Sequence, residues 1–348
     1  MNYQNKIKTS PQYDFKDVLI EPCKSTVTTR SNVFLERLFT FKQNNTTLEC
    51  VPIIAANMDT TGTFEVYDVL SKKNIITAFH KFYTKDDYLR MGNKLHPDLF
   101  MVSAGISNDD FTRLVSILDC INCRWICIDI ANGYLSSLLT FCQRVRTRFP
   151  DKIIVAGNVA TKEGVIELIA RGGVDVVKVG IGPGSACTTR LKTGVGVPQL
   201  SSIMECAEMA HLAGGYIIAD GGITCPGDLG KALGAGADFV MMGGQFAGHD
   251  ENPGEVIEDE SDGKKYKLFY GMSSERAMKK HYGEMASYRS SEGRSIKIPY
   301  KGALIDTVND YLGGLRSTCT YVGANRVELL FEKVFFRVVS QQVNRVFA

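Results

Sequence analysis

The sequence lacks the features that tie a protein to a nucleic-acid polymer or a membrane. Its 40 Lys and Arg residues nearly balance 38 Asp and Glu residues, so the formal net charge is only +2, and no long Lys/Arg block occurs. A nucleic-acid partner is therefore not expected, whereas a small anionic ligand fits this charge balance. No apolar run reaches the roughly 18 residues of a transmembrane helix. Residues 1–6 also lack the apolar core of a secretory signal.

Cysteine usage points to a reducing compartment. Ten cysteines without a secretory signal predict free thiols in a cytoplasmic protein. Cys120 and Cys123 form a C-x-x-C, but an isolated pair is weak evidence for a metal or redox site. No G-x-G-x-x-G opens a helix after the first apolar run, which weighs against a dinucleotide-binding doubly wound sheet.

Short apolar runs alternate with helix-like stretches along most of the chain. The runs cover residues 51–56, 74–79, 99–104, 125–130, 152–156, 175–179, 216–219 and 238–242. The segments between them show apolar residues about 3.6 positions apart. They cover residues 63–73, 85–95, 109–120, 135–149, 162–171, 201–213 and 226–234. Continuous apolar runs suit parallel strands buried on both faces, so eight such units predict an α/β fold of the (β/α)8 TIM-barrel type. An open doubly wound sheet is the alternative.

We expect one catalytic domain over residues 1–348. Residues 1–45 form an N-terminal extension in this scheme, and residues 303–348 form the closing helix and the C-terminal tail. Residues 247–300 are polar, charged and interrupted by glycine. A long insertion at the active end of a barrel commonly serves as a mobile flap.

A glycine-rich loop over residues 180–190 carries the strongest signal for chemistry. Cys187 lies in this loop, with Thr188, Thr189 and Arg190 directly after it. A thiol beside a cation and unpaired backbone N–H groups ionises readily, so Cys187 is a candidate nucleophile. The alternative is a buried, inert cysteine. Glu292 is a candidate acid in the flap; on its own it reads as a solvated carboxylate, but beside Thr189 it can relay a proton.

Other polar and glycine residues follow the expected strands, where barrel enzymes place their sites. The Asp220 carboxylate can either accept hydrogen bonds from ribose hydroxyls or cap the turn that follows it. His80 suits either the core or the barrel mouth. Two glycine pairs follow the last expected strands, where backbone N–H groups commonly bind phosphate, although each pair also suits a plain tight turn. They are Gly221-Gly222 and Gly243-Gly244.

The loop Gly182-Pro183-Gly184-Ser185-Ala186-Cys187-Thr188-Thr189-Arg190 resembles the signature loop of the IMP dehydrogenase/GMP reductase family. Further segments are similar to the GMP reductases in particular, and together they extend the resemblance over nearly the whole chain. They cover residues 15–19, 55–60, 77–81, 270–275, 288–293 and 317–324. The resemblance implies an NADPH-dependent oxidoreductase of purine salvage that converts GMP to IMP and ammonia.

The same resemblance implies roles for individual residues. Cys187 attacks purine C2 to form a covalent thioimidate, with Thr189 and Glu292 handling the proton, before NADPH delivers hydride. GMP contacts fall on Asp220, Gly221, Gly222, Gly243, Gly244, Gly271, Met272, Ser273, Arg289, Ser290, Ser291 and Gly293. NADPH contacts, partly across a subunit boundary, fall on Thr29, Arg30, His80, Asp129, Ile130, Ala131, Tyr288, Arg289, Ser317, Thr318, Cys319 and Thr320. The resemblance also implies a site for a monovalent cation, K⁺, at Gly182, Gly184, Cys187 and Arg190.

The family likeness also implies a cytoplasmic homotetramer whose small-molecule partners are GMP and NADPH. Two other functions remain open at this point. One is the oxidation of IMP to XMP by an IMP dehydrogenase; it is disfavoured because no regulatory domain pair interrupts the barrel and no Arg-Tyr dipeptide occurs in residues 247–300. The other is a non-catalytic barrel that senses purine nucleotides, which has no need for a thiol.

Overall fold

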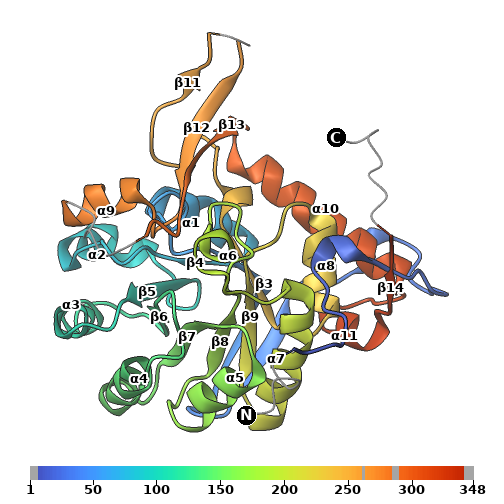
Figure 1. Ribbon diagram of the computed structural model, residues 1–348, viewed down its shortest axis with the longest axis horizontal. Coiled ribbons are helices and arrows are strands. Elements are labelled where there is room, and N and C mark those ends of the chain that lie inside the picture. Colours follow the sequence, from blue (N-terminus) through green and yellow to red (C-terminus); the bar gives the residue numbers. More distant parts are fainter. Residues whose placement is uncertain (1–6, 261–262, 284–289, 341–348) are drawn as a thin grey trace.

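The computed structural model describes residues 7–260, 263–283 and 290–340, and within them eight parallel strands close into a barrel (Figure 1). The last barrel strand pairs in parallel with the first, Val240 lying opposite Ile53, so the ring of eight strands is closed. This closure confirms the predicted TIM barrel and excludes an open sheet. The strands are β3 (Thr46–Ala55), β4 (Ile75–Ala78), β5 (Phe100–Ala104), β6 (Trp125–Asp129), β7 (Ile153–Val159), β8 (Val176–Val179), β9 (Tyr216–Asp220) and β10 (Phe239–Met242).

Helices surround the barrel and bury the outer face of its strands. Several begin at side-chain caps that the sequence supplies: Thr63 accepts a hydrogen bond from Val66 N, and Thr84 and Ser107 each form a capping box. Because helices cover the outside and side chains fill the inside, strands such as β5 are buried along their whole length. The helices of this ring are α1 (Phe64–Leu70), α2 (Lys85–Met91), α3 (Asn108–Leu118), α4 (Ser136–Arg148), α5 (Lys162–Ala170), α7 (Gln199–Ala213), α8 (Pro226–Gly234) and α10 (Leu304–Tyr321).

A hairpin closes the N-terminal end of the barrel. Strand β2 (Arg37–Phe41), within the expected N-terminal extension, pairs antiparallel with β3. Its Phe39 ring stacks on Phe239 at 4.1 Å between centroids, and its Phe41 ring meets Trp125 edge-on at 5.4 Å. Both phenylalanines are buried against the first residues of barrel strands, so they form an apolar plug at that end.

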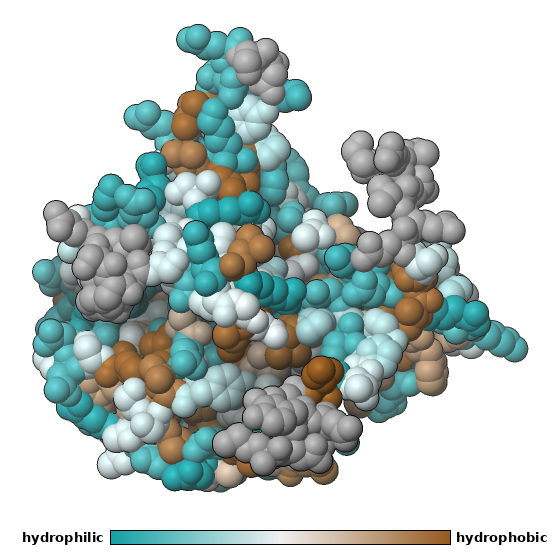
Figure 2. Space-filling view, viewed as in Figure 1, coloured by the Kyte–Doolittle hydropathy of each residue, from teal (hydrophilic) through white to brown (hydrophobic). Residues whose placement is uncertain are grey.

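We call the described part of residues 247–300 the arm; it contains an antiparallel sheet, a helix and the segments that connect them. The arm comprises β11 (Ile257–Glu258), β12 (Lys265–Tyr270), α9 (Glu275–Tyr282) and β13 (Ser295–Pro299), and its sheet projects away from the barrel (Figure 1). Sequence analysis expects a flap over these residues; its movement stays a prediction. Figure 2 shows that the arm surface is largely hydrophilic, with small apolar groups between polar ones.

Two short strands, one from the N-terminal and one from the C-terminal part of the described chain, pair with each other. Strand β1 (Val18–Ile20) pairs antiparallel with β14 (Phe336–Val338), which follows the short helix α11 (Leu330–Lys333). The single-domain organisation stays a prediction. Within the described ranges, no helix combines the length and the apolar character needed to cross a membrane.

Candidate active site

Cys187, Thr189 and Glu292 form a hydrogen-bonded chain at the C-terminal end of the barrel. The Cys187 thiol donates to Thr189 Oγ1 at 3.2 Å, and the Thr189 hydroxyl donates to Glu292 Oε2 at 2.8 Å. Cys187 is partly exposed, whereas three other cysteines are exposed and the remaining six are buried. A thiol, a hydroxyl and a carboxylate in series can pass a proton between a nucleophile and a ligand.

The backbone fixes this chain of groups by pairing the cysteine loop with the end of the arm. Thr188 N donates to Glu292 O at 2.8 Å, and Arg294 N donates to Ala186 O at 2.9 Å. Cys187 and Gly293 therefore form an antiparallel bridge. The short helix α6 (Thr189–Thr193) begins directly after this bridge. Glu292 thus reaches Thr189 because its own backbone is bonded to the loop that carries the cysteine.

Glycines allow the loop to approach the strand ends. Gly180 has φ +149°, and a Cβ there would lie 2.1 Å from Asp220 O. Gly221 has φ +89°, and a Cβ there would lie 3.0 Å from the Pro183 ring. Side chains at either position would push the loop away from β9, so the glycines predicted from sequence have a steric reason here.

The residues expected to hold GMP surround Cys187 where the structure describes them. Gly221 and Gly222 contact the loop at Pro183, and a Cβ on Gly244 would meet Ser185 Oγ at 2.9 Å. On the arm, Gly271 lies against Ala186 O and the Gly293 backbone. Met272, Ser273, Ser290 and Ser291 belong to the same two arm segments, and Gly243 lies beside Met58.

A buried lysine that sequence analysis missed lies beneath this site. Lys178 Nζ is 3.2 Å from Asp129 Oδ1, 3.2 Å from Asp220 Oδ2 and 3.3 Å from Asn57 Oδ1. Burial alone would lower the pKa of Lys178, but the Asp129 and Asp220 carboxylates outweigh it and raise the pKa. The lysine therefore stays protonated and joins two residues expected to contact different ligands.

Two amides complete the same network. Asn57 donates to Asp129 Oδ2 at 2.8 Å, and Asn158 donates to Asp220 Oδ2 at 2.9 Å. A signal for this network was present in the sequence: a lysine inside an otherwise apolar run must find carboxylates when it is buried. The neighbouring strand ends supply them.

Comparison with known proteins tests the family resemblance. The family model of the "IMP dehydrogenase / GMP reductase domain" matches residues 12–345. The chain belongs to this family. GMP reductase 2 of Homo sapiens is 53% identical over 346 residues, covering 98% of each chain. GMP reductase 1 of Mus musculus and GMP reductase of Yersinia pestis (strain Pestoides F) are each 52% identical over 346 residues, covering 98% of this chain and 99% of theirs. Like its relatives, this member of the IMP dehydrogenase/GMP reductase family is an oxidoreductase.

The residues that the family resemblance assigns to NADPH fall into two groups. His80 follows β4 at the barrel mouth, and Asp129 ends β6, directly before Ile130 and Ala131. Thr29 and Arg30 lie at the 3-10 helix η3 (Arg30–Asn32), which packs on α10, where Ser317, Thr318, Cys319 and Thr320 lie. Helix α10 packs between α8 and α1, and β6 is on the opposite side of the barrel (Figure 1). Tyr288 and Arg289 lie outside the described residues.

His80 is a neutral group in this setting. Its ring stacks on Tyr83 at 3.9 Å between centroids, and burial lowers its pKa to about 4. At neutral pH it therefore offers one donor and one acceptor, without a charge.

The residues assigned to K⁺ form a tight turn. Arg190 Nη1 donates to Asp14 Oδ2 at 3.1 Å, and Nη2 donates to Val197 O at 2.7 Å. Gly184 O accepts a hydrogen bond from Cys187 N at 3.0 Å, and a Cβ on Gly182 would clash with Arg190. Carbonyl oxygens of such a turn suit a hard cation like K⁺. Within the described ranges, no cluster of three or more His, Cys, Asp or Glu side chains suits a metal ion. In the C-x-x-C pair, Cys123 is buried, and burial raises the pKa of its thiol to about 12.

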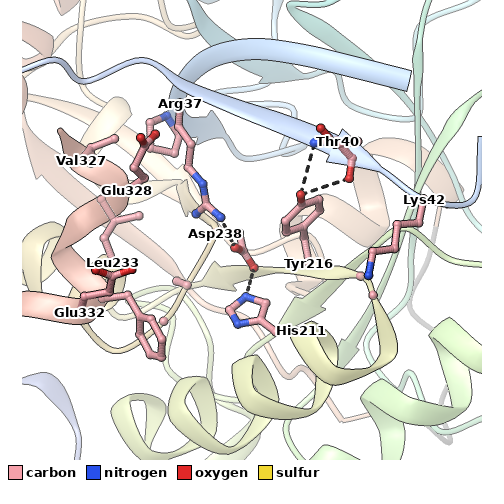
Figure 3. A pocket seen from close by; sticks show the side chains of 16 residues that line it. Arg37, Thr40, Lys42, His211, Tyr216, Leu233, Asp238, Val327, Glu328 and Glu332 are labelled. Atoms are coloured by element: carbon pink, nitrogen blue, oxygen red, sulfur yellow. Dashed lines mark hydrogen bonds and ion pairs between the residues drawn. The ribbon is translucent and has the colours of Figure 1, made fainter. Parts of the chain in front are cut away.

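A cavity of about 360 Å³ lies at the opposite end of the barrel, beside the apolar plug (Figure 3). It contains Asp238, which is buried and accepts hydrogen bonds from Arg37 and His211, each at 2.9 Å. Asp238 precedes β10, so this cavity is remote from the strand ends that carry Cys187.

Proposed function

We propose that the protein is a GMP reductase, which converts GMP to IMP and ammonia at the expense of NADPH. The observation that carries the proposal is the chain of groups Cys187–Thr189–Glu292 at the barrel mouth. The GMP reductases that align over nearly the full chain support it. An IMP dehydrogenase reading has no comparable support among these relatives.

In the proposed reaction, Cys187 is the nucleophile. Its sulfur adds to C2 of GMP, and the thiol proton passes to Thr189 and Glu292. The same pair then protonates the 2-amino group, which departs as ammonia and leaves a thioimidate between Cys187 and C2. NADPH, when bound, supplies the hydride for C2. The Cys187–C2 bond then breaks with its electrons returning to sulfur, and IMP is released.

The described site fits the two ligands. Asp220 and the glycines at residues 221, 222, 243 and 244 line the strand ends around the cysteine loop, where a nucleotide would contact ribose and phosphate groups through a carboxylate and backbone N–H groups. Asp129 lies at the same mouth, 3.2 Å from Lys178, and we keep its assignment to NADPH as part of the proposal. We also retain K⁺ at the turn of residues 182–190, a homotetramer and a cytoplasmic location as proposals.

The decisive experiment combines the purified protein with GMP and NADPH. We expect loss of NADPH absorbance together with equimolar ammonia and IMP, identified by chromatography. Formation of xanthosine monophosphate from IMP and NAD⁺, without any reaction of GMP, would support the dehydrogenase instead. Binding of GMP without turnover under either condition would support the sensor.

A further inference from the structure

A single buried carboxylate joins the arm to the barrel. Asp59, which follows β3, accepts hydrogen bonds at Oδ2 from the Tyr270 hydroxyl at 2.9 Å, Lys280 Nζ at 2.8 Å and His281 Nε2 at 2.6 Å. Tyr270 ends β12, and the other two donors lie on α9. All three donors thus come from the arm, and the acceptor comes from the barrel.

Aromatic packing reinforces this junction from a second strand end. The His281 ring stacks on Phe82 with 3.5 Å between centroids and 2° between planes. Phe82 follows β4 and precedes α2, so α9 is held beside the barrel mouth by two different loops (Figure 1). Lys280 also donates to the Tyr270 hydroxyl at 3.1 Å, which ties α9 to β12 inside the arm.

The charge of Asp59 favours the docked position of the arm over an undocked one. Asp59 is only 4% exposed, and its Oδ1 has no partner among the described residues. Burial raises the pKa of Asp59, but the bonds from Lys280 and His281 outweigh burial and lower it. A buried carboxylate that loses its hydrogen-bond donors, the Lys280 ammonium among them, is strongly unfavourable. Moving the arm away would remove all three donors, so the charge favours the docked arm.

The docked arm supplies two parts of the proposed site. Tyr270 directly precedes the segment Gly271–Ser273, and Gly271 lies against Ala186 O in the cysteine loop. The arm also carries Glu292, whose backbone pairs with that loop. We propose that Asp59 is a positioning residue that docks the arm through Tyr270, Lys280 and His281 and so holds Glu292 against Thr189. The inference rests on the proposed function for its catalytic consequence, but not for the docking itself.

Hydrogen–deuterium exchange of the free enzyme tests the docking. In Asp59→Asn, which keeps the size of the side chain but loses its charge, we expect amides of residues 275–282 to exchange about tenfold faster. Amides of β5 and β6 should not change. The matched control is Glu275→Gln, which removes an exposed ion pair to Lys279 on the same helix. Unchanged exchange of α9 in Asp59→Asn would overturn the proposal.

The effect of Asp59 on catalysis is tested by measuring ammonia release and hydride transfer separately. We expect Asp59→Asn to slow ammonia release from GMP about tenfold, because Glu292 serves that step. Hydride transfer, measured in reverse as reduction of NADP⁺ by IMP, should change less than about threefold. Equal slowing of both steps would reject a role through Glu292. If the wild-type enzyme fails to reduce GMP, the proposed function fails, while the exchange experiment still decides the docking.

A double-mutant cycle distinguishes coupling between Asp59 and His281 from a general loss of folding. His281→Phe keeps an aromatic ring on Phe82 but removes the donor to Asp59. If the residues act as one unit, the effects of Asp59→Asn and His281→Phe on ammonia release should be strongly non-additive. Additive effects would show that Asp59 acts independently of α9 and would contradict the proposal.

Discussion

The Thr189 hydroxyl donates a 2.8 Å hydrogen bond to Glu292, although 103 positions of sequence separate the two residues. For Glu292→Gln we expect ammonia release to slow by about 10²–10³, because the amide cannot carry the proton. Hydride transfer should slow far less. Rapid-quench detection of ammonia, compared with reverse NADP⁺ reduction by IMP, measures the two steps. Equal slowing would mean that Glu292 only positions the loop.

Removal of the thiol should abolish turnover without abolishing binding. In Cys187→Ala we expect GMP affinity within about threefold of wild type and activity reduced by more than about 10³, because no covalent adduct forms. Calorimetric titration and NADPH oxidation measure the two quantities. Intact-mass analysis of the wild-type enzyme with GMP should show the adduct. A fully active Cys187→Ala enzyme would reject covalent catalysis.

Lys178→Met should destabilise the fold, because it leaves Asp129 and Asp220 without their shared cation. We expect a loss of about 3 kcal/mol in the free energy of unfolding, measured by urea denaturation. The exposed Lys162→Met is the control, with an expected change below about 0.5 kcal/mol. A loss no larger than the control would mean that the two carboxylates find other partners.

The apolar plug can be tested with two neighbours on one strand. Phe39→Ala removes a fully buried ring and should cost about 3–5 kcal/mol of unfolding free energy. Leu38→Ala, on the exposed face of β2, should cost less than about 1 kcal/mol. Thermal unfolding of the two variants side by side measures the difference. Similar losses would show that the plug contributes little.

The His211–Asp238 pair predicts a pH dependence of stability. The hydrogen bond that His211 donates to Asp238 raises the pKa of His211 above its ordinary value, although burial opposes it. A raised folded-state pKa means that the stabilisation is complete below about pH 6.5 and is lost as pH rises through the folded-state pKa. His211→Gln should therefore reduce the free energy of unfolding by about 1 kcal/mol near pH 6, a small loss because the side chain is 34% exposed. Near pH 9 the loss should be much smaller, because the imidazole of the unmutated protein is then neutral. A cost that grows with pH in urea titrations would contradict this assignment.

The barrel was predictable because its signals are local. Each of the eight strands overlaps one of the apolar runs, and a helical repeat follows each run except the last, so most strand and helix bounds lie within a few residues of the expected ones. The loop with Cys187 and Thr189 was found for a similar reason, since glycines and reactive side chains adjoin in sequence. Glu292 entered as a candidate through its neighbours in the flap.

The remaining structure depends on contacts between distant segments. The β1–β14 pairing joins Val18 to Val338, and no periodic pattern in either segment indicates its partner. Strand β2 falls within the expected N-terminal extension because it precedes the barrel, and the plug appears only when Phe39 meets Phe239. Lys178 was read as part of a strand, and Asp59 as part of a motif, because their partners come from other elements.

The apolar plug also determines the route that molecules can take. With Phe39 and Phe41 filling one end of the barrel, that end offers no passage to the reaction centre. Under the proposed function, the nucleotide and its product therefore enter and leave at the C-terminal ends of the strands, where the cysteine loop and the arm meet.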